Sequence, residues 1–295
     1  MMNLSQELTL AAQYGNMPFD VFLIERWDRT ADVAQDKQQW DKLARRYLAL
    51  KPREREPYHK EASRRWQQQQ RHHITSNPSA TLKAETEAAA ADDIIITRIL
   101  PSMQTIQERN FYARRLTQTS HEPALVRTYY GTIDGENRDE AYKAMAQNFL
   151  LEACVDENGV WDDRTLYDVG DNWQNVVLRM PGLGDEEATL GREDEYYDGD
   201  GVLDRDPPGA DERDKLEVWL RKKKLATRLY VVDREAMEKG MVKVFYLDPH
   251  GNVAWSHKFR TEAMLEYTGA WHGMNWADIN WCFSETGEDG SELLF

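Results

Sequence analysis

The stretch from Met17 to about Gln70 most constrains what this chain can fold into, because it combines helical periodicity with a local excess of basic charge. Its bulky apolar residues recur at the spacing that places side chains on one face of an α-helix. The pattern predicts three short amphipathic helices whose aromatic side chains pack together. The three apolar faces are Phe19, Phe22, Leu23 and Trp27; Trp40, Leu43, Tyr47 and Leu50; and Tyr58, Ala62 and Trp66.

Three prolines indicate where these helices begin and end. Pro18 and Pro57 suit the first turn of a helix, where a missing N–H leaves no bond unmade, so we expect the first and third helices to begin there. Pro52, with Lys51 before it, is expected to end the second helix, because the residue before a proline disfavours helical geometry. The result is a small three-helix module.

The charge of this stretch differs in sign from that of the rest of the chain. Residues 17–73 contain 13 Lys and Arg against 9 Asp and Glu, whereas the 295-residue chain carries a net charge of -15. Such asymmetry is typical of a nucleic-acid-binding module attached to an acidic body. Any contact with nucleic acid is therefore expected to involve this basic stretch and not the acidic remainder of the chain.

The same stretch resembles an HMG box. The run from Tyr47 to Tyr58 (YLALKPREREPY), followed by Ala62, has the spacing of that family's helix corner, and the opening PFDVF at Pro18 is similar to its first motif. The region between the first two helices is shorter than in the family, and Tyr47 replaces the usual tryptophan. Asp20 stands where sequence-reading members often have an amide or a hydroxyl. An acid there cannot donate to a base acceptor in the minor groove, so little sequence specificity is expected.

The resemblance implies minor-groove DNA binding with bending, in which an apolar side chain wedges between base steps and cations hold the phosphates. By resemblance Leu23 is the wedge and Phe19 a secondary one. The phosphate contacts implied are Arg26, Arg29, Lys37, Lys42, Arg45 and Arg46.

A second interpretation explains the same residues without DNA. The aromatic residues then form only a core, the charges are solvated, and the degenerate box no longer binds DNA. The protein would act as a protein–protein interaction module, with its aromatic C-terminal domain recognising a protein partner. Asp20 and the other acids of the box favour this alternative.

The composition along the chain predicts a multidomain protein. We expect an N-terminal lead-in (1–16), an all-α, HMG-box-like three-helix domain (17–72), a helical linker (73–122) and an α+β domain (123–295). An insertion loop at 182–214 is rich in acids, glycine and proline. This acidic loop is expected to compete with DNA for the basic face.

Within the α+β domain the patterns predict strands over 124–130, 173–180, 228–232, 242–247 and 253–259, and a helix over 139–151. Asp134-Gly135 and the run Asp248 to Asn252 are expected turns. A helix is expected from Thr261, followed by an aromatic element over 276–283. This half weakly resembles a small uncharacterised α+β domain family, on Leu125 to Thr128 and Gly269 to Ile279, and that resemblance implies no function.

Other candidate sites are better explained by local structure. The acids from Asp198 to Asp204 resemble part of a calcium loop, but no register supplies the full ligand spacing, which favours a solvated loop. Asp248 and His250 fit turn chemistry more simply than a metal or acid–base site. The cluster from Arg221 to Lys224 is either a localisation signal or the charged end of a helix.

We find no catalytic, metal or cofactor motif, no secretory signal and no apolar run long enough to span a membrane. Cys154 and Cys282 are the only cysteines, which suggests a reducing compartment. An enzyme of unknown class remains a third interpretation, supported only by an α+β domain of ample size. The leading expectation is a non-enzymatic, chromatin-associated protein of the nucleus that binds double-stranded DNA and needs no cofactor.

Overall fold

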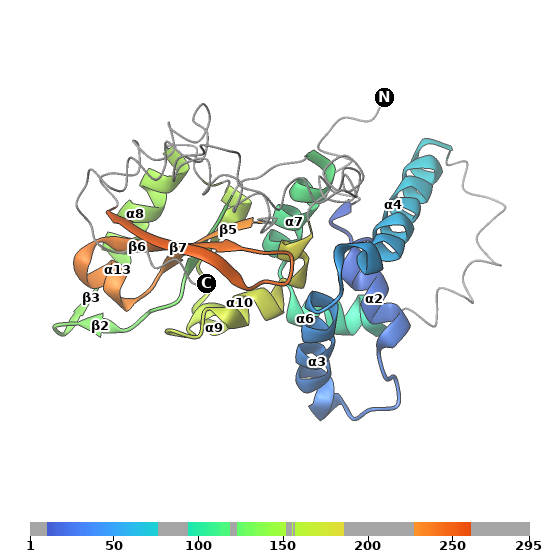
Figure 1. The fold of residues 1–295 in the computed structure, drawn as a ribbon, viewed down its shortest axis with the longest axis horizontal. Coiled ribbons are helices and arrows are strands. Elements are labelled where there is room, and N and C mark those ends of the chain that lie inside the picture. The colour runs from blue at the N-terminus through green and yellow to red at the C-terminus, as the bar shows by residue number, and fades with distance from the viewer. Residues whose placement is uncertain are drawn as a thin grey trace, which may run out of the picture. The chain divides into compact units, whose positions relative to one another are not determined.

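The computed structural model describes residues 11–75, 94–118, 123–151, 155, 157–185 and 227–260, which form two compact units (Figure 1). Unit 1 comprises Met1–Ser120 and Val176–Glu187, and unit 2 comprises His121–Asn175 and Ala188–Phe295. Unit 1 is helical and unit 2 contains a mixed sheet. The expected multidomain α+β organisation is confirmed at this level.

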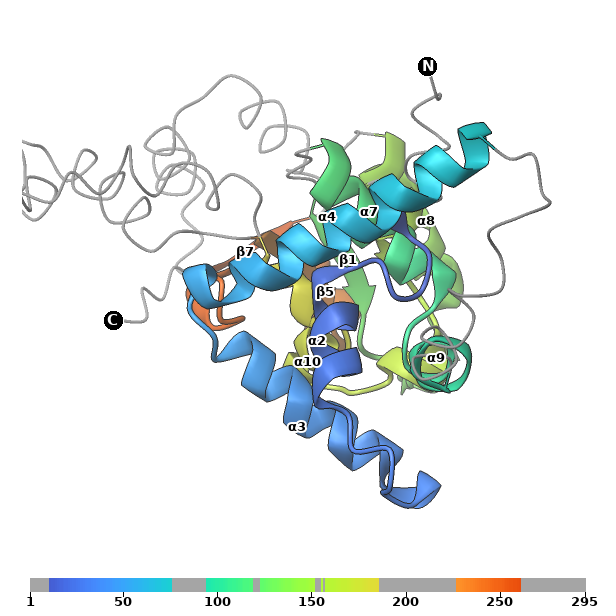
Figure 2. The ribbon, with the colours of Figure 1, turned by 90° about the vertical axis from the view of Figure 1, so that its right-hand side faces the viewer.

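The first part of unit 1 forms the three expected helices, but the third begins earlier than predicted. It begins at Pro52, so Pro57 lies inside the helix and the prediction of a helix start at Pro57 is wrong. The Glu54 carboxylate accepts the Lys51 N–H at 2.7 Å, and this cap lets Pro52 occupy the first turn. Figure 2 shows α2 in the angle between α3 and α4. The elements are α2 (Pro18–Arg26), η1 (Val33–Gln35), α3 (Asp36–Leu48) and α4 (Pro52–Thr75).

The second part of unit 1 comes from two later segments of the chain. The described part of the expected linker (73–122) belongs to unit 1 instead of standing apart from it. Residues 176–185, which we call the strap, also belong to unit 1, although they were expected in the α+β domain and its acidic loop. The strand predicted over 173–180 is wrong, because a helix occupies this position. The elements are the π-helix η2 (Ile95–Ile99), α6 (Leu100–Met103), α7 (Ile106–Gln118), α10 (Gln174–Arg179) and the 3₁₀ helix η4 (Pro181–Gly184).

An aromatic cluster fills the core between α2, α3 and α4. The Phe19 ring centroid lies 5.2 Å from those of Trp40 and Tyr47, and the Phe22 centroid lies 5.3 Å from those of Tyr47 and Tyr58. All four contacts are edge-on, the arrangement that the charge distribution of aromatic rings favours. The predicted apolar faces of these helices therefore do meet in a shared core.

Unit 2 contains a five-stranded sheet in the order β4-β1-β5-β6-β7. β1 lies parallel to both β4 and β5, whereas β5, β6 and β7 are antiparallel neighbours. The strands predicted near 124, 228, 242 and 253 are confirmed. The sheet strands are β1 (Ala124–Arg127), β4 (Val160–Trp161), β5 (Thr227–Val232), β6 (Met241–Leu247) and β7 (Val253–Arg260).

Both predicted turns of unit 2 are present. Asp134 and Gly135 have φ values of 52° and 79°, as a tight type I′ hairpin requires, and they join β2 (Thr132–Ile133) to β3 (Glu136–Asn137). The Asp248 carboxylate accepts the N–H groups of His250 and Asn252 and so closes the turn between β6 and β7. The other elements of unit 2 are α8 (Asp139–Leu151), η3 (Glu157–Gly159), α9 (Arg164–Tyr167) and α13 (Arg234–Lys239).

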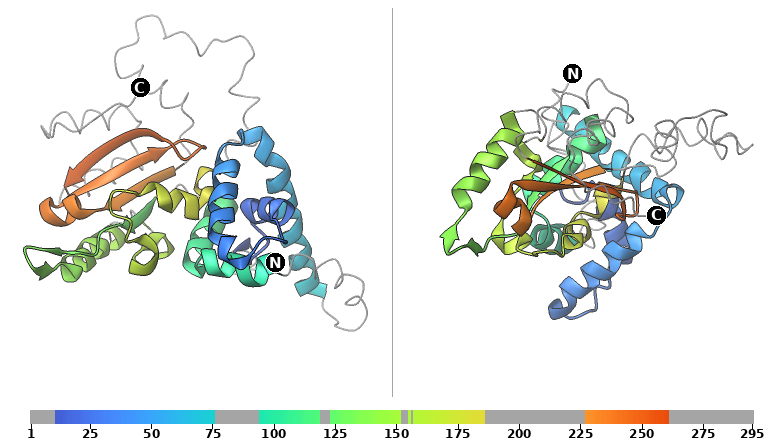
Figure 3. Two further views of the ribbon diagram at one scale, coloured as in Figure 1. Left: turned by 90° about the horizontal axis from the view of Figure 1, so that it is seen from below. Right: turned by 60° about the vertical axis from the view of Figure 1, so that its left-hand side comes forward.

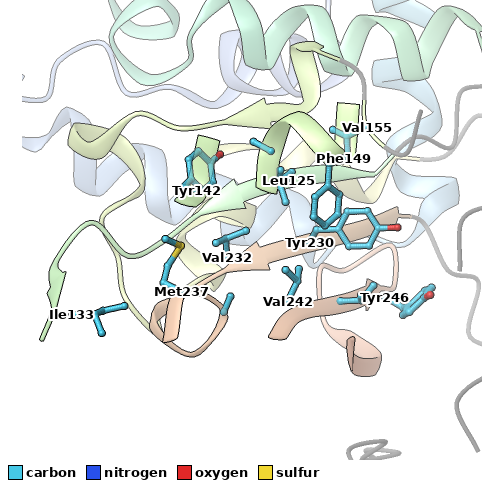
Figure 4. Close-up of a cluster of buried hydrophobic side chains, with 13 residues drawn as sticks. Leu125, Ile133, Tyr142, Phe149, Val155, Tyr230, Val232, Met237, Val242 and Tyr246 are labelled. Carbon is cyan, nitrogen blue, oxygen red and sulfur yellow. The ribbon is translucent and has the colours of Figure 1, made fainter. Parts of the chain in front are cut away.

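One face of the sheet packs against α8 (Figure 3). Alternate residues of β5 and β6 point to this face, and Phe149 of α8 lies 5.2 Å from Tyr230 between ring centroids. Figure 4 shows this core, with β-branched and aromatic side chains converging from helix and sheet. The helix predicted over 139–151 is confirmed, since its apolar face is what covers the sheet.

Several expectations concern residues outside the described part of the chain. They include most of the lead-in, the calcium-loop-like run from Asp198, the basic cluster from Arg221, the helix from Thr261 and the aromatic element over 276–283. None of the helices in the described ranges is both long enough and apolar enough to cross a membrane.

Candidate nucleic-acid interface

The two residues predicted to wedge between base steps lie in the core of unit 1. Leu23 is 0 % exposed and Phe19 is 1 % exposed. Phe19 packs among the rings of Trp40 and Tyr47, so it is held by the aromatic cluster. A side chain in this position cannot reach DNA without opening the core, and the wedge assignments of Leu23 and Phe19 therefore do not fit this structure.

Asp20 has an internal role that its sequence position did not suggest. Its carboxylate accepts the N–H groups of Gly15 at 2.9 Å and Met17 at 3.2 Å, which satisfies donors at the start of α2. It also accepts two hydrogen bonds from the buried Arg109 guanidinium, at 3.1 and 2.6 Å. Asp20 is thus neutralised inside unit 1 and presents no charge to an external phosphate.

The six cations predicted to hold phosphates are all exposed, but they differ in their surroundings. Lys37 forms an ion pair with Asp41 at 2.8 Å on the same helix. A hydrogen bond with Tyr58 raises the pKa of Arg26. Arg29 also interacts with another part of the protein. These three are partly committed to neighbours within the protein.

Lys42, Arg45 and Arg46 form the remaining group, which we call the α3 cations. Residues three and four positions apart on a helix are neighbours, so Lys42 lies beside both arginines. The opposite face of α3 is buried through Trp40, Leu43, Ala44 and Tyr47, which fixes the orientation of the exposed face. In the described part of the chain no carboxylate forms an ion pair with any α3 cation.

The C-terminal end of α3 stabilises positive charge even when no ligand is bound. Arg45 and Arg46 lie in the last turn of α3, where the partial negative charge of the helix C-terminus attracts them. Their mutual repulsion acts in the opposite direction and would be relieved by a bound polyanion. Lys42 can bind a phosphate as a point charge, and each arginine can bind one through two parallel hydrogen bonds.

Sequence reasoning missed a second charged cluster, at the carboxyl end of β1 in unit 2. The Arg127 guanidinium donates to Asp139 at 2.5 Å and lies 3.6 Å from Asp162. It also stacks on the rings of Tyr130 and Tyr142, 4.4 and 4.7 Å from their centroids. The signal available in the sequence was only an arginine at the end of a buried strand.

The two tyrosines of this cluster are poor acids. Burial, and then the nearby Asp162 carboxylate, raise the pKa of Tyr130 and of Tyr142 far above that of a free phenol. A hydrogen bond from Arg127 lowers the pKa of Asp139. Arg127 is stacked on both rings and paired with both acids, so its charge is compensated within unit 2.

The described residues provide no candidate metal centre. No group of three or more His, Cys, Asp or Glu side chains in these ranges could hold a metal ion. Asp248 and His250, considered as an acid–base pair, form the turn described above.

Comparisons of the chain with protein-family models, with curated proteins and with solved structures found no match. Neither resemblance noted in the sequence therefore gains or loses support from a relative.

Proposed function

We propose that the α3 cations bind the phosphate backbone of double-stranded DNA with little sequence specificity, and that the protein acts as a non-enzymatic, chromatin-associated protein of the nucleus. One observation supports this proposal above the others. Lys42, Arg45 and Arg46 are exposed, adjacent and without an ion-pair partner among the described residues, on a helix whose other face is buried. Because the helix is anchored, little backbone conformational entropy is lost on binding.

The proposed contact is simpler than the one the HMG-box resemblance implied. With Leu23 and Phe19 in the core, neither of the two predicted wedges is available to unstack base pairs, so the proposed mode involves phosphate contacts without strong bending. Phosphate contacts position a protein on DNA but do not read its sequence. The proposed function is therefore backbone binding of low specificity.

The test is a titration of a fluorescent DNA duplex with the full chain at two salt concentrations. Three phosphate contacts predict that affinity falls about 40-fold between roughly 50 and 200 mM salt, through counterion release. The variant Lys42→Ala/Arg45→Ala/Arg46→Ala should bind more weakly and lose most of this salt dependence.

The matched control removes three exposed cations from unit 2. Lys143, Arg164 and Arg234 each form an ion pair with a nearby acid, so the triple alanine variant changes the net charge equally without touching α3. Equal binding by the two triple variants would refute the proposal. A four-way-junction probe should bind no more than a few-fold tighter than the duplex, because both predicted wedges, Leu23 and Phe19, are buried.

The second candidate is the protein–protein interaction module. It is favoured by the burial of Phe19 and Leu23 and by the internal pairing of Asp20 with Arg109. In this interpretation the α3 cations only stabilise the end of their helix. Absence of DNA binding at low salt would decide for it.

A further inference from the structure

The strap, which consists of the end of α10 and of η4, is held in unit 1 as a bound peptide would be held in a receptor. Its apolar residues Val176, Met180 and Leu183 are buried, and its last residue, Asp185, is only 4 % exposed. The side chains that hold it come from α3, α4, α7 and the residue after α6, all within the first 118 residues. The strap thus reaches unit 1 from a distant part of the sequence.

Three side chains of unit 1 bind carbonyl groups of the strap main chain. Trp40 Nε1 donates to the carbonyl of Leu178 at 2.9 Å, and Gln104 Nε2 donates to that of Arg179 at 3.0 Å. Arg55 Nη1 donates to the carbonyl of Gly184 at 3.2 Å. These bonds require a particular path of the backbone and are independent of the strap's side chains.

An aspartate anchors the C-terminal end of the strap. Asp185 accepts hydrogen bonds from Tyr47 at 2.7 Å, from Arg55 at 3.0 Å and from Tyr112, and His59 Nε2 lies 3.6 Å away. All four donors belong to α3, α4 or α7. A carboxylate buried among four donors is strongly preferred over a neutral side chain.

An arginine and a glycine complete the recognition pattern. Arg179 forms two hydrogen bonds with the buried Glu108 carboxylate, at 2.7 and 3.0 Å. Gly182 lies against the Tyr112 ring, where an added Cβ would be 2.2 Å from ring atom Cζ. Tyr112 cannot move aside freely, because its hydroxyl donates to Asp185. Only glycine fits this position.

We propose that unit 1 is a peptide receptor for the pattern Arg-x-x-Gly-x-x-Asp, and that the strap occupies it in cis. The selecting groups are Glu108 for the arginine, the Tyr112 ring for the glycine, and Arg55 with its neighbours for the aspartate. A peptide of the same pattern, supplied in trans, binds the same groove when the strap is displaced. Because the strap belongs to the same chain, its high effective concentration excludes a free peptide from the intact protein.

This interaction surface is separate from the proposed DNA contact. None of the α3 cations bonds to the strap, within the described residues, and they lie on the exposed face of α3 whereas Trp40 and Tyr47 lie on the buried face. Failure of DNA binding would therefore leave the peptide proposal standing, and the converse also holds.

The experiment uses the full chain carrying Gly182→Ala, which weakens the strap and leaves every receptor residue intact. The probe is a fluorescently labelled peptide with the sequence of residues 174–187, QNVVLRMPGLGDEE. Fluorescence anisotropy should show that it binds the variant at least 30-fold more tightly than it binds the unaltered chain. A peptide with Asp185→Asn should bind the variant about 100-fold more weakly than the unaltered peptide, because it leaves buried cationic donors unpaired.

Equal binding of the two peptides, or equal binding to the two chains, would overturn the proposal. If the variant does not fold alone, it is refolded from urea with either peptide. Recovery of the near-UV circular dichroism signal with the unaltered peptide, and not with the Asp185→Asn peptide, supports the receptor. Recovery with both or with neither overturns it.

Discussion

Arg109 and Asp20 form a buried ion pair across 89 positions of sequence, with a shortest N–O distance of 2.6 Å. Arg109 also donates to the carbonyl groups of Ala12 and Gln13, so one guanidinium ties α7 to the segment before α2. The three helices with the HMG-box pattern are consequently part of a larger helical unit. Their behaviour should depend on residues that the pattern does not include.

Removing one partner of this pair should destabilise unit 1 strongly. Asp20→Ala leaves the Arg109 charge buried and unpaired, which typically costs about 3–5 kcal/mol. Urea unfolding of the full chain, with hydrogen exchange used to assign the transition to unit 1, measures the loss. Arg64→Ala, which breaks an exposed pair with Glu61, is the control and should cost less than about 1 kcal/mol. Similar losses for the two variants would contradict the structural role of Asp20.

The variant Leu23→Ala distinguishes a role of Leu23 in the core from a role as a DNA wedge. Because Leu23 is fully buried, its truncation should lower the free energy of unfolding of unit 1 by about 2–5 kcal/mol. DNA affinity, measured at a temperature where the variant remains folded, should stay within a few-fold of the original. A large loss of affinity with unchanged stability would restore the wedge interpretation.

The elements that could be predicted from sequence are those whose partners lie nearby along the chain. The helix over 139–151 has a complete apolar face, and the strands β5, β6 and β7 carry β-branched and aromatic residues with clear turns between β6 and β7. The three helices of unit 1 also follow from periodicity. In each case the local pattern and the packed structure agree.

The predictions that the structure contradicts failed for a different physical reason. The run WQNVVLRM contains only a short apolar stretch, which does not distinguish a strand from a buried helix. In the structure, hydrogen bonds from Trp40 and Gln104 hold the last two residues of this helix. The burial of Leu23 and Phe19 depends on their packing within a whole unit, which periodicity cannot supply. Exposure of the α3 cations was predictable, because they lie opposite the apolar face of their helix.

Acid should weaken the anchoring of the strap through Asp185. Burial alone would raise its pKa, but His59, Arg55 and the Tyr112 hydroxyl outweigh this and lower it to about 2, from 3.8. Since the folded-state pKa lies below the unfolded one, Asp185 contributes stability above pH 4 and loses it as the pH falls towards 2. The linked change is about 2 kcal/mol.

The measurement compares the unaltered chain with Asp185→Asn between pH 6 and pH 2. The free energy of unfolding of unit 1 should differ between the two chains by about 2 kcal/mol less at pH 2 than at pH 6. Asp41→Asn changes a more exposed carboxylate of the same unit and serves as the control. A difference that stays constant with pH would show that Asp185 does not titrate in this way.

Deleting the predicted acidic loop should have different effects according to where the deletion begins. Removal of 182–214 eliminates Gly182 and Asp185, so unit 1 should lose cooperative unfolding and gain hydrogen exchange along α3 and α7. Replacement of 188–214 by a neutral linker of equal length should leave both unchanged. The expected competition between acidic loop and DNA is therefore tested with the second variant, whose DNA affinity should rise. Equal losses of cooperative unfolding and of protection in both variants would mean that the strap is not what stabilises unit 1.

Arg127→Lys should destabilise unit 2 although it preserves the charge. Arg127 stacks on Tyr130 and Tyr142 while its Nε donates to the Tyr129 carbonyl at 3.0 Å and its Nη2 donates to Asp139. A lysine ammonium has no planar face for the two rings and cannot reproduce the fork of donors, so the loss should be about 1–3 kcal/mol.

Hydrogen exchange at β1 and β5, together with urea unfolding, provides the measurement for this substitution. Arg164→Lys is the matched control, because its side chain is exposed and its pair with Asp168 spans one turn of helix; it should cost less than about 0.5 kcal/mol. If Arg127→Lys were equally mild, the charge alone would explain the cluster and the stacking would contribute nothing. If it instead abolished protection throughout unit 2, the arginine would be essential to the junction between α8 and the sheet.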